Sequence, residues 1–240
     1  VHERAGNVDA VGDIGERGKG RPVRQRGEGV VEDPPHGSPS LETEVPKLLA
    51  ARGERPEVTL VHRLDAGTSG LLVMARTRAA TRRLNQAFRE GEVDKRYLAL
   101  VQGRFSRTER VNAPIARVKG TRHGVRDDGR PARTDFASLT AAGQAALVEA
   151  TLHTGRTHQI RVHASHLGHP LLGDRLYGGP GYTVHAPPKA IARPMLHAYE
   201  LGFDLSNGTR RVFRSLPPSD FRALAEAYGL GHAVLGERDA

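Results

Sequence analysis

Apolar residues fall into strand-length runs over much of the chain. Two such runs, residues 58–64 and 70–76, stand on either side of a short polar loop. Residues 132–140 and 145–155 are apolar-rich segments joined by the turn AAGQ, which predicts an antiparallel hairpin. The other expected strands are residues 95–103, 195–205 and 210–216.

Helical periodicity is clearest over residues 77–91, where Ala80, Leu84, Ala87 and Phe88 share one face. The expected helix boundaries are Gly91 for this helix, Ser40 and Gly53 for residues 40–53, Gly168 for residues 157–168, and Ser219 for residues 219–229. Strands outnumber helices, and short loops join most of them. The sequence therefore predicts an α+β fold with a mixed, mostly antiparallel sheet core flanked by helices.

Residues 1–37 have a different composition from the rest of the chain. They contain eight Gly but no Leu, Phe, Tyr or Trp, and they show no strand or helix period. Such a segment cannot bury enough apolar surface to offset its loss of conformational entropy on folding. We therefore expect residues 1–37 to be disordered, with 29–31 as the single strand candidate, followed by one folded domain over 38–230 and a tail over 231–240.

The composition indicates a basic protein of a reducing compartment. The net charge is +9, and 31 of the 36 basic residues are Arg. Guanidinium groups pair with phosphate in a planar fork and stack on bases, which favours a nucleic-acid partner, although a GC-rich genome also raises the Arg content. The absence of Cys excludes disulfides and thiol catalysis, and no apolar run approaches the roughly 20 residues of a membrane span. We expect a soluble cytoplasmic protein without a signal peptide or a membrane partner.

The segment HRLDAGTSGLL, residues 62–72, places the carboxylate of Asp65 between Arg63 and a run of small residues. An Asp before Gly and Ser is most often part of an exposed turn. The apolar runs on both sides favour a loop held between buried strands, which can present a functional side chain. In such a loop Asp65 can serve as a nucleophile, because a nearby guanidinium favours the ionised carboxylate.

A second set of charged residues lies in TGRTHQIRVH, residues 154–163. Arg156 falls in a turn before the expected helix, where backbone N–H groups favour an anion. Arg161 lies within the helix beside its apolar face, so its guanidinium needs a carboxylate partner. Asp65 is a candidate for that partner, and a structural ion pair is the alternative role for Arg161.

Histidines are the third feature, because His163 and His166 stand three residues apart in the expected helix. No Cys or acidic residue accompanies them at a spacing typical of metal ligands. We therefore expect no metal site, and we expect the histidines to lie on the helix surface or to face RNA.

Four sequence blocks resemble, in order and spacing, those of the RluA family of RNA pseudouridine synthases. The blocks are HRLDAGTSGLLVMAR at 62–76, KRYLALVQG at 95–103, TGRTHQIRVHASHLGHPLLGDRLYG at 154–178 and LHAYELGF at 196–203. The resemblance covers residues 38–220 and is most specific in the third block. It implies the pseudouridine synthase catalytic fold and a single-domain enzyme that acts on structured ribosomal or transfer RNA. Because the reaction exchanges no electrons or groups with a third molecule, we expect no cofactor or metal, and we expect a monomer.

The resemblance also implies catalytic roles for three residues. The family detaches a uridine base from its sugar, rotates it and rejoins it through carbon. Asp65 matches the catalytic Asp that attacks the substrate at the sugar or at the base ring. Tyr97 matches the active-site Tyr that packs against the target base, and Arg161 matches the basic residue that pairs with the catalytic Asp. The alternative for Tyr97 is a tyrosine that fills the core of the sheet.

Substrate binding requires base flipping, because the enzyme must reach a uridine inside a stem or loop. Arg63 matches an Arg that occupies the space of the flipped nucleotide, and Leu196 lies in a block that walls the pocket. We expect the substrate-binding residues to be Arg63, Thr68, Arg156, His158 and Leu196. The basic, Gly-rich segment 116–133 is expected to select the RNA as a loop that orders on binding, with a solvated hairpin as the alternative.

The N-terminal region departs from the family pattern. Family members carry a strand and a Lys-Pro turn upstream of HRLD, whereas the corresponding segment here, residues 26–40, reads RGEGVVEDPPHGSPS. We interpret residues 1–35 as the product of a shifted reading frame or a misassigned start, and the alternative is a natural disordered arm. In either case we expect a sheet strand to be missing, which would leave an exposed edge and lower stability.

Two other function classes compete with an RNA-modifying enzyme. A non-catalytic RNA-binding protein or chaperone of this fold would have no reason to keep Asp65, Tyr97 and Arg161 together. A metal hydrolase built on the histidines lacks the accompanying carboxylates. The sequence therefore predicts an RNA pseudouridine synthase.

Overall fold

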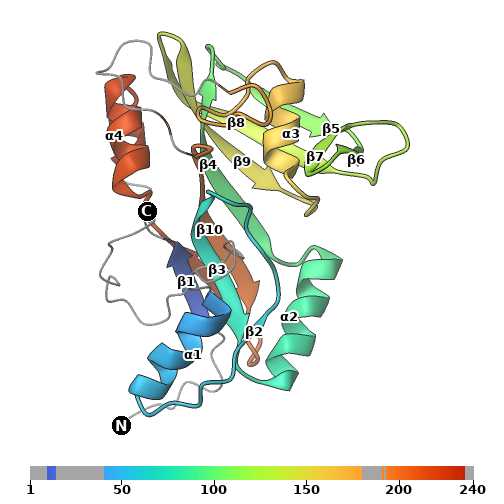
Figure 1. The fold of residues 1–240 in the computed structure, drawn as a ribbon, viewed down its shortest axis with the longest axis vertical. Coiled ribbons are helices and arrows are strands. Elements are labelled where there is room, and N and C mark those ends of the chain that lie inside the picture. The colour runs from blue at the N-terminus through green and yellow to red at the C-terminus, as the bar shows by residue number, and fades with distance from the viewer. Residues whose placement is uncertain (1–9, 15–40, 180–190, 192, 236–240) are drawn as a thin grey trace. The chain divides into compact units, whose positions relative to one another are not determined.

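The computed structural model describes two compact units of the chain (Figure 1). The described residues are 10–14 (backbone only), 41–179, 191 and 193–235. Unit 1 comprises residues 1–94 and 200–216, and unit 2 comprises residues 95–199 and 217–240. The chain passes from one unit to the other at the start of β4 (Asp94–Gln102), within β10 (Leu196–Asp204), and again between residues 216 and 217.

Unit 1 is centred on β3 (Ser69–Ala75), which is buried along its whole length. This strand pairs antiparallel with β1 (Ala10–Ile14) and with β2 (Thr59–Leu60). The second half of β10 pairs antiparallel with β11 (Arg210–Arg214). The helices of this unit are α1 (Leu41–Ala51) and α2 (Arg78–Glu90).

Helix α2 has the boundaries that its sequence predicts. The hydroxyl of Thr77 accepts a hydrogen bond from the Ala80 N–H at 3.1 Å, and Gly91 ends the helix at a φ of 78°, which favours glycine. Leu84, on the apolar face of the helix, belongs to one buried cluster with Val73 of β3 and Phe203 of β10. This cluster holds β3, and therefore the end of the loop that precedes it, in a defined position.

Unit 2 contains an antiparallel sheet and a separate two-stranded hairpin. The strands are β5 (Thr108–Asn112), β6 (Ile115–Lys119), β7 (Arg122–Val125), β8 (Arg133–Ala142) and β9 (Ala145–Leu152). The sheet order is β10–β4–β9–β8–β5, while β6 and β7 pair with each other. The helices are α3 (Gln159–His166), α4 (Ser219–Ala227) and α5 (Gly231–Leu235). The β8–β9 pair confirms the hairpin expected on either side of AAGQ.

Helix α3 is almost entirely buried within unit 2. Leu100 of β4 and Leu147 of β9 pack with Phe221 of α4 in the main cluster. Helix α3 lies against β7 and β8 (Figure 1), and its residues 159–164 are all buried. Polar side chains in this helix must therefore find partners inside the protein.

The expected α+β class with a mixed, mostly antiparallel sheet is confirmed, because the pairs β1–β3, β10–β11, β4–β9, β5–β8 and β8–β9 are antiparallel and helices pack beside the strands. None of the described helices combines the length and the apolarity that a membrane crossing needs.

The N-terminal expectation is wrong at one segment. Residues 10–14 form β1 and pair with β3, so the disorder expected over residues 1–37 does not include them. The family strand expected to be missing corresponds to residues 26–40, which lie outside the described residues. Strand formation here depends on pairing with the backbone of β3, which is distant in sequence, and local composition does not report that contact. The strand candidate at 29–31 and the expected cap Ser40 lie outside the described residues.

Two expectations near the C-terminus are also wrong. Pro218, not Ser219, occupies the N-cap position of α4, and no side chain caps this helix. Residues 231–235 were expected in a tail, but they form α5, and Val234 belongs to the main core cluster. A five-residue helix contains too few turns to show a helical period in the sequence, and tertiary packing stabilises it.

Candidate functional site

The loop that carries Asp65 is anchored on both sides of that residue. On the N-terminal side, His62 Nε2 accepts a hydrogen bond from the Val73 N–H at 3.0 Å, just beyond the point where β2 stops pairing with β3. The His62 ring also stacks on Phe88 of α2 with centroids 4.6 Å apart, and Leu64 is buried. On the C-terminal side, the Thr68 N–H donates to the Asp65 carbonyl at 2.9 Å. The loop therefore presents a half-buried Asp65 from a fixed backbone.

The neighbours of Asp65 differ in their exposure. Arg63 is exposed, whereas Thr68 is only 4% exposed. The Thr68 hydroxyl is buried and has no hydrogen-bond partner among the described residues. An unsatisfied buried hydroxyl costs about 1–3 kcal/mol, and a hydrogen bond between the Thr68 hydroxyl and a ligand would offset that cost.

Unit 2 carries the other expected site residues. Tyr97 lies in β4 opposite Ala150 of β9 and is 9% exposed. Leu196 begins β10 and is buried. Arg156, His158 and Arg161 lie in or just before α3, so the structure brings these three onto one short segment of unit 2.

Asp174 is a carboxylate partner of Arg161 in the structure, and it was not among the residues expected at the site. Arg161 Nε donates to Asp174 Oδ2 at 2.6 Å, and Nη2 donates to Oδ1 at 3.0 Å. The side chains are 7% and 1% exposed. The need for a buried carboxylate partner is thus confirmed, while pairing of Arg161 with Asp65 stays a prediction. The available signal was the Asp of GHPLLGDRLYG, thirteen residues after Arg161 in the same block.

His158 has a strained backbone at the start of α3. Its φ of 56° makes it the one non-glycine residue with positive φ in the part of the chain that the structure describes. Its Nδ1 lies 2.7 Å from the hydroxyl of Tyr177, and the two rings meet edge to face. Strain of this kind persists only where the surroundings over-determine the conformation, and it is common at functional sites.

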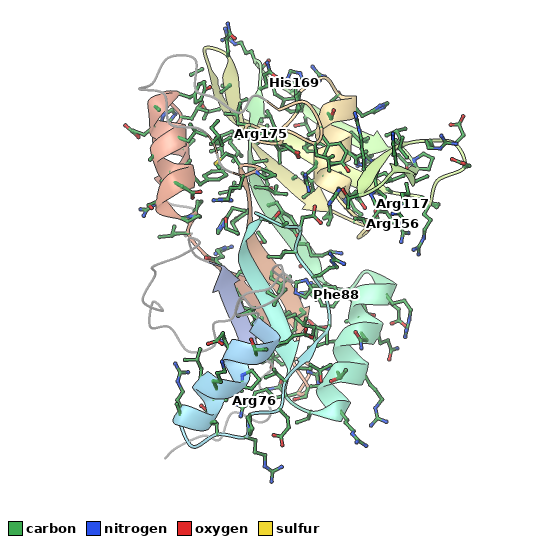
Figure 2. The ribbon with its side chains drawn as sticks, in the orientation of Figure 1. Arg76, Phe88, Arg117, Arg156, His169 and Arg175 are labelled. Atoms are coloured by element: carbon green, nitrogen blue, oxygen red, sulfur yellow. The ribbon has the colours of Figure 1, made fainter. Side chains whose placement is uncertain are left out.

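Segment 116–133 is an ordered hairpin, not a loop, over its first half. It contains most of β6 and all of β7, and the His123 N–H donates to the Tyr177 hydroxyl at 3.0 Å. Arg156 Nε donates to the carbonyl of Pro131 at 2.9 Å. Burial and the nearby charge of Arg130 lower the pKa of Arg156, and an anion near both groups would offset their repulsion. Figure 2 shows Arg117 of β6 and Arg156 in the same part of unit 2.

Both ring nitrogens of His163, one of the two histidines considered for a metal site, lie within hydrogen-bond distance of other protein atoms. Its Nδ1 lies 2.9 Å from Thr134 Oγ1, and its Nε2 lies 2.9 Å from the carbonyl oxygen of Ala113. Burial lowers the pKa of this histidine, which favours the neutral ring. Within the described ranges, no group of three or more His, Cys, Asp or Glu side chains could hold a metal ion.

Asp135 of β8 lies among three basic side chains on the sheet of unit 2. It accepts hydrogen bonds from Arg110 and Arg133, and its Oδ2 lies 2.8 Å from His153 Nε2. Partial burial opposes ionisation, but the hydrogen bonds and positive charges of Arg133 and His153 outweigh it and lower the pKa of Asp135 to about 2.

This pKa shift predicts a loss of stability in acid. Because the folded-state pKa lies below the ordinary value of 3.8, ionised Asp135 stabilises the protein above pH 3.8, and that contribution is lost as the pH falls toward 2. Urea unfolding followed by circular dichroism between pH 5 and pH 2.5 checks this for the wild type and for Asp135→Asn. We expect the difference in unfolding free energy between the two to shrink steadily over this range, and the exposed Asp127→Asn variant serves as the charge-matched control. A wild-type advantage that is unchanged at pH 2.5 would contradict the prediction.

Comparisons with known proteins point to one family. A family model described as RNA pseudouridylate synthase matches residues 28–166, a range that includes Asp65, Tyr97 and Arg161. A protein named "Uncharacterized RNA pseudouridine synthase" from Chloroflexus aurantiacus is 43% identical over 178 residues, which are 72% of this chain and 54% of that protein. A "Ribosomal large subunit pseudouridine synthase D" from Nitrosomonas europaea is 39% identical over 177 residues, 72% of this chain and 52% of that protein. The chain spans about half the length of the curated relatives that it matches.

Solved structures agree with the expected fold. The structure titled "Human RNA Pseudouridylate Synthase Domain Containing 1" aligns with a TM-score of 0.58 and 28% identity, over 77% of this chain and 83% of that chain. The structure titled "Human RNA Pseudouridylate Synthase Domain Containing 4" has a TM-score of 0.66 at 23% identity, over 81% and 85% of the two chains, and indicates a shared fold. The family match begins at residue 28, ten residues before the start of the domain expected from the sequence.

Proposed function

Because the chain belongs to the RNA pseudouridylate synthase family, we propose that it isomerises uridine to pseudouridine in a folded RNA. The observation that carries the proposal is the family match over residues 28–166, which includes the proposed nucleophile and both of its proposed helpers. The reaction breaks the bond between N1 of the base and C1′ of the sugar, and forms a bond between C5 and C1′. The hydrogen of C5 leaves as a proton and N1 gains one, so the product is an isomer. No electrons or groups pass to a third molecule, and the reaction needs neither cofactor nor metal.

In this proposal Asp65 is the nucleophile. A carboxylate can attack an electron-poor sugar carbon, as it does in retaining glycosidases, and the attack requires that the carboxylate be held where the substrate atom arrives. The anchors of its loop support this role, because His62 and Thr68 restrain the backbone on either side of Asp65. We expect the target base to flip out of the RNA, with Arg63 filling the vacated space and the buried Thr68 hydroxyl contacting the substrate.

Unit 2 contributes the remaining proposed residues. As the family resemblance implies, Tyr97 packs against the flipped base, Leu196 contacts the same base, and Arg161 supplies the basic group of the reaction. Arg156 and His158 contact the RNA. The half-buried position of Arg156, close to Arg130, supports binding of a backbone phosphate there.

Large-subunit ribosomal RNA is the substrate that we propose to test first. Relatives from Nitrosomonas europaea and Vibrio cholerae bear the names ribosomal large subunit pseudouridine synthase D and C. The charge of +9 suits a phosphate-rich partner, although it does not distinguish ribosomal from transfer RNA.

The test measures tritium release from transcripts that contain uridine labelled at C5, because the C5 hydrogen is lost in the reaction. The full chain is incubated separately with large-subunit ribosomal RNA and with transfer RNA. We expect time-dependent release from ribosomal RNA that stops at a whole number of sites per transcript. Absence of release from every RNA, with RNA binding retained, would overturn the proposed activity in favour of a non-catalytic RNA-binding protein.

A further inference from the structure

The Arg161–Asp174 pair is almost completely removed from water. Its two hydrogen bonds use the Nε and Nη2 edge of the guanidinium, and the Asp174 side chain is 1% exposed. Removing two charges from water costs several kcal/mol per ion, and a well-packed apolar pair of similar volume is often as stable or more stable. A contribution to stability is therefore a weak explanation for the presence of this buried ion pair. Its geometric effect is definite, because a bidentate bond sets the plane and the direction of the guanidinium.

The backbone that carries Asp174 is itself held rigidly. The Leu176 N–H donates to Asp174 Oδ1 at 3.2 Å, and the Gly179 N–H donates to the Asp174 carbonyl at 2.7 Å. Gly173 and Gly179 flank the turn, and a Cβ atom on either would lie within 2.1 Å of a backbone oxygen, at 2.1 Å from Arg193 O and 1.7 Å from Leu171 O respectively. The turn is therefore packed too closely to move without rearranging its neighbours.

Tyr177 of the same turn supports the guanidinium from a second direction. The Arg161 Cζ lies 5.0 Å from the centroid of the Tyr177 ring, within the range of a cation–π contact. The ring is 5% exposed, and its hydroxyl is held by His158 Nδ1 and by the His123 N–H. Asp174 thus holds one edge of the guanidinium, while Tyr177 holds one of its faces.

We propose that Asp174 and Tyr177 are positioning residues that orient the guanidinium of Arg161 for the isomerisation. This inference rests on the proposed function, in which Arg161 supplies the basic group of the isomerisation. With the Nε and Nη2 edge bound to Asp174 and one face covered by Tyr177, the direction of the opposite edge, Nη1 and the second Nη2 hydrogen, is determined. Misplacement of a catalytic group by about 1 Å can cost roughly 10²-fold in rate, so the orientation has a measurable consequence.

The experiment compares Asp174→Asn with a matched control, Asp220→Asn, by steady-state tritium release from C5-labelled RNA. Asparagine keeps the shape of Asp174 but turns an amide N–H₂ toward a guanidinium that only donates hydrogen bonds. Asp220 forms another bidentate pair in unit 2, with Arg193 Nε and Nη2, both at 2.7 Å. We expect Asp174→Asn to lower kcat by roughly 10²-fold with KM changed by less than ~3-fold, and Asp220→Asn to keep the wild-type kcat. Rates are normalised to the folded fraction from circular dichroism, so a loss of stability alone would not lower kcat.

A second pair of variants tests the contact between the Tyr177 ring and Arg161. These variants decide whether the inference holds if Asp174→Asn does not fold. Tyr177→Phe keeps the ring beneath Arg161, while Tyr177→Leu removes it. We expect Tyr177→Leu to lower kcat by roughly 10-fold and Tyr177→Phe to stay within ~3-fold of the wild type. If Asp174→Asn folds and has the wild-type kcat, the inference is overturned. If Asp174→Asn does not fold, equal kcat values in the wild type and in both Tyr177 variants overturn it. Either result leaves the proposed function intact. A wild type that releases no tritium from any RNA would overturn the proposed function, and the inference with it.

Discussion

The Asp65→Asn variant is expected to release at least ~10³-fold less tritium per unit time than the wild type, because the amide that replaces the carboxylate is not a nucleophile. The side chain keeps its size, and three anchors of the loop use other groups: His62 binds the Val73 N–H, Leu64 is buried, and the Thr68 N–H binds the Asp65 carbonyl. The variant should therefore fold and bind RNA within about threefold of the wild-type affinity. Single-turnover release from C5-labelled RNA with enzyme in excess measures the effect on the chemical step, separately from product release.

The matched control for this prediction is Glu57→Gln. Glu57 is an exposed carboxylate of the same unit, two residues before β2, so its substitution changes the net charge equally without touching the Asp65 loop. It should keep the wild-type rate. An Asp65→Asn rate within tenfold of the wild type would exclude Asp65 as the nucleophile.

The Arg161→Met variant is expected to lose about 3–5 kcal/mol of unfolding free energy, because it leaves the buried Asp174 carboxylate without its cation. In this variant the Leu176 N–H is the one hydrogen-bond donor to that carboxylate that remains among the described residues. Methionine fills much of the volume of the arginine stem, so the loss reports the unpaired charge more than a cavity. Urea denaturation followed by circular dichroism measures the shift in midpoint.

The double variant Arg161→Met/Asp174→Leu separates these causes. Replacing both charges by apolar side chains of similar size removes the unpaired carboxylate, so the double variant should be more stable than Arg161→Met alone. A double variant that is less stable than the single variant would show that cavity formation or strain, and not the buried charge, destabilises the protein. Both variants should lack activity, because both lack Arg161.

Much of the fold could be predicted from local sequence. The hairpin of β8 and β9 is visible as two apolar segments around a turn, and helix α2 as a repeating apolar face that ends at Gly91. In both cases the information lies within about twenty-five consecutive residues, close to the range over which periodicity and turn chemistry act. Strand β1 shows the limit of such reasoning, since its partner lies about sixty residues away and its own residues carry no strand pattern.

The sequence by itself determined the family of this protein and the candidate residues, because the blocks around Asp65, Tyr97 and Arg161 are ordered strings of residue types that can be recognised without coordinates. Only the tertiary structure decided how those residues are held. It assigned Asp174 to Arg161, placed Tyr177 under the guanidinium, tied His62 to Val73 and put His158 at a positive φ. The physical reason is that each of these facts depends on the direction of a side chain or a backbone amide across packed elements, and residue spacing along the chain contains no such direction.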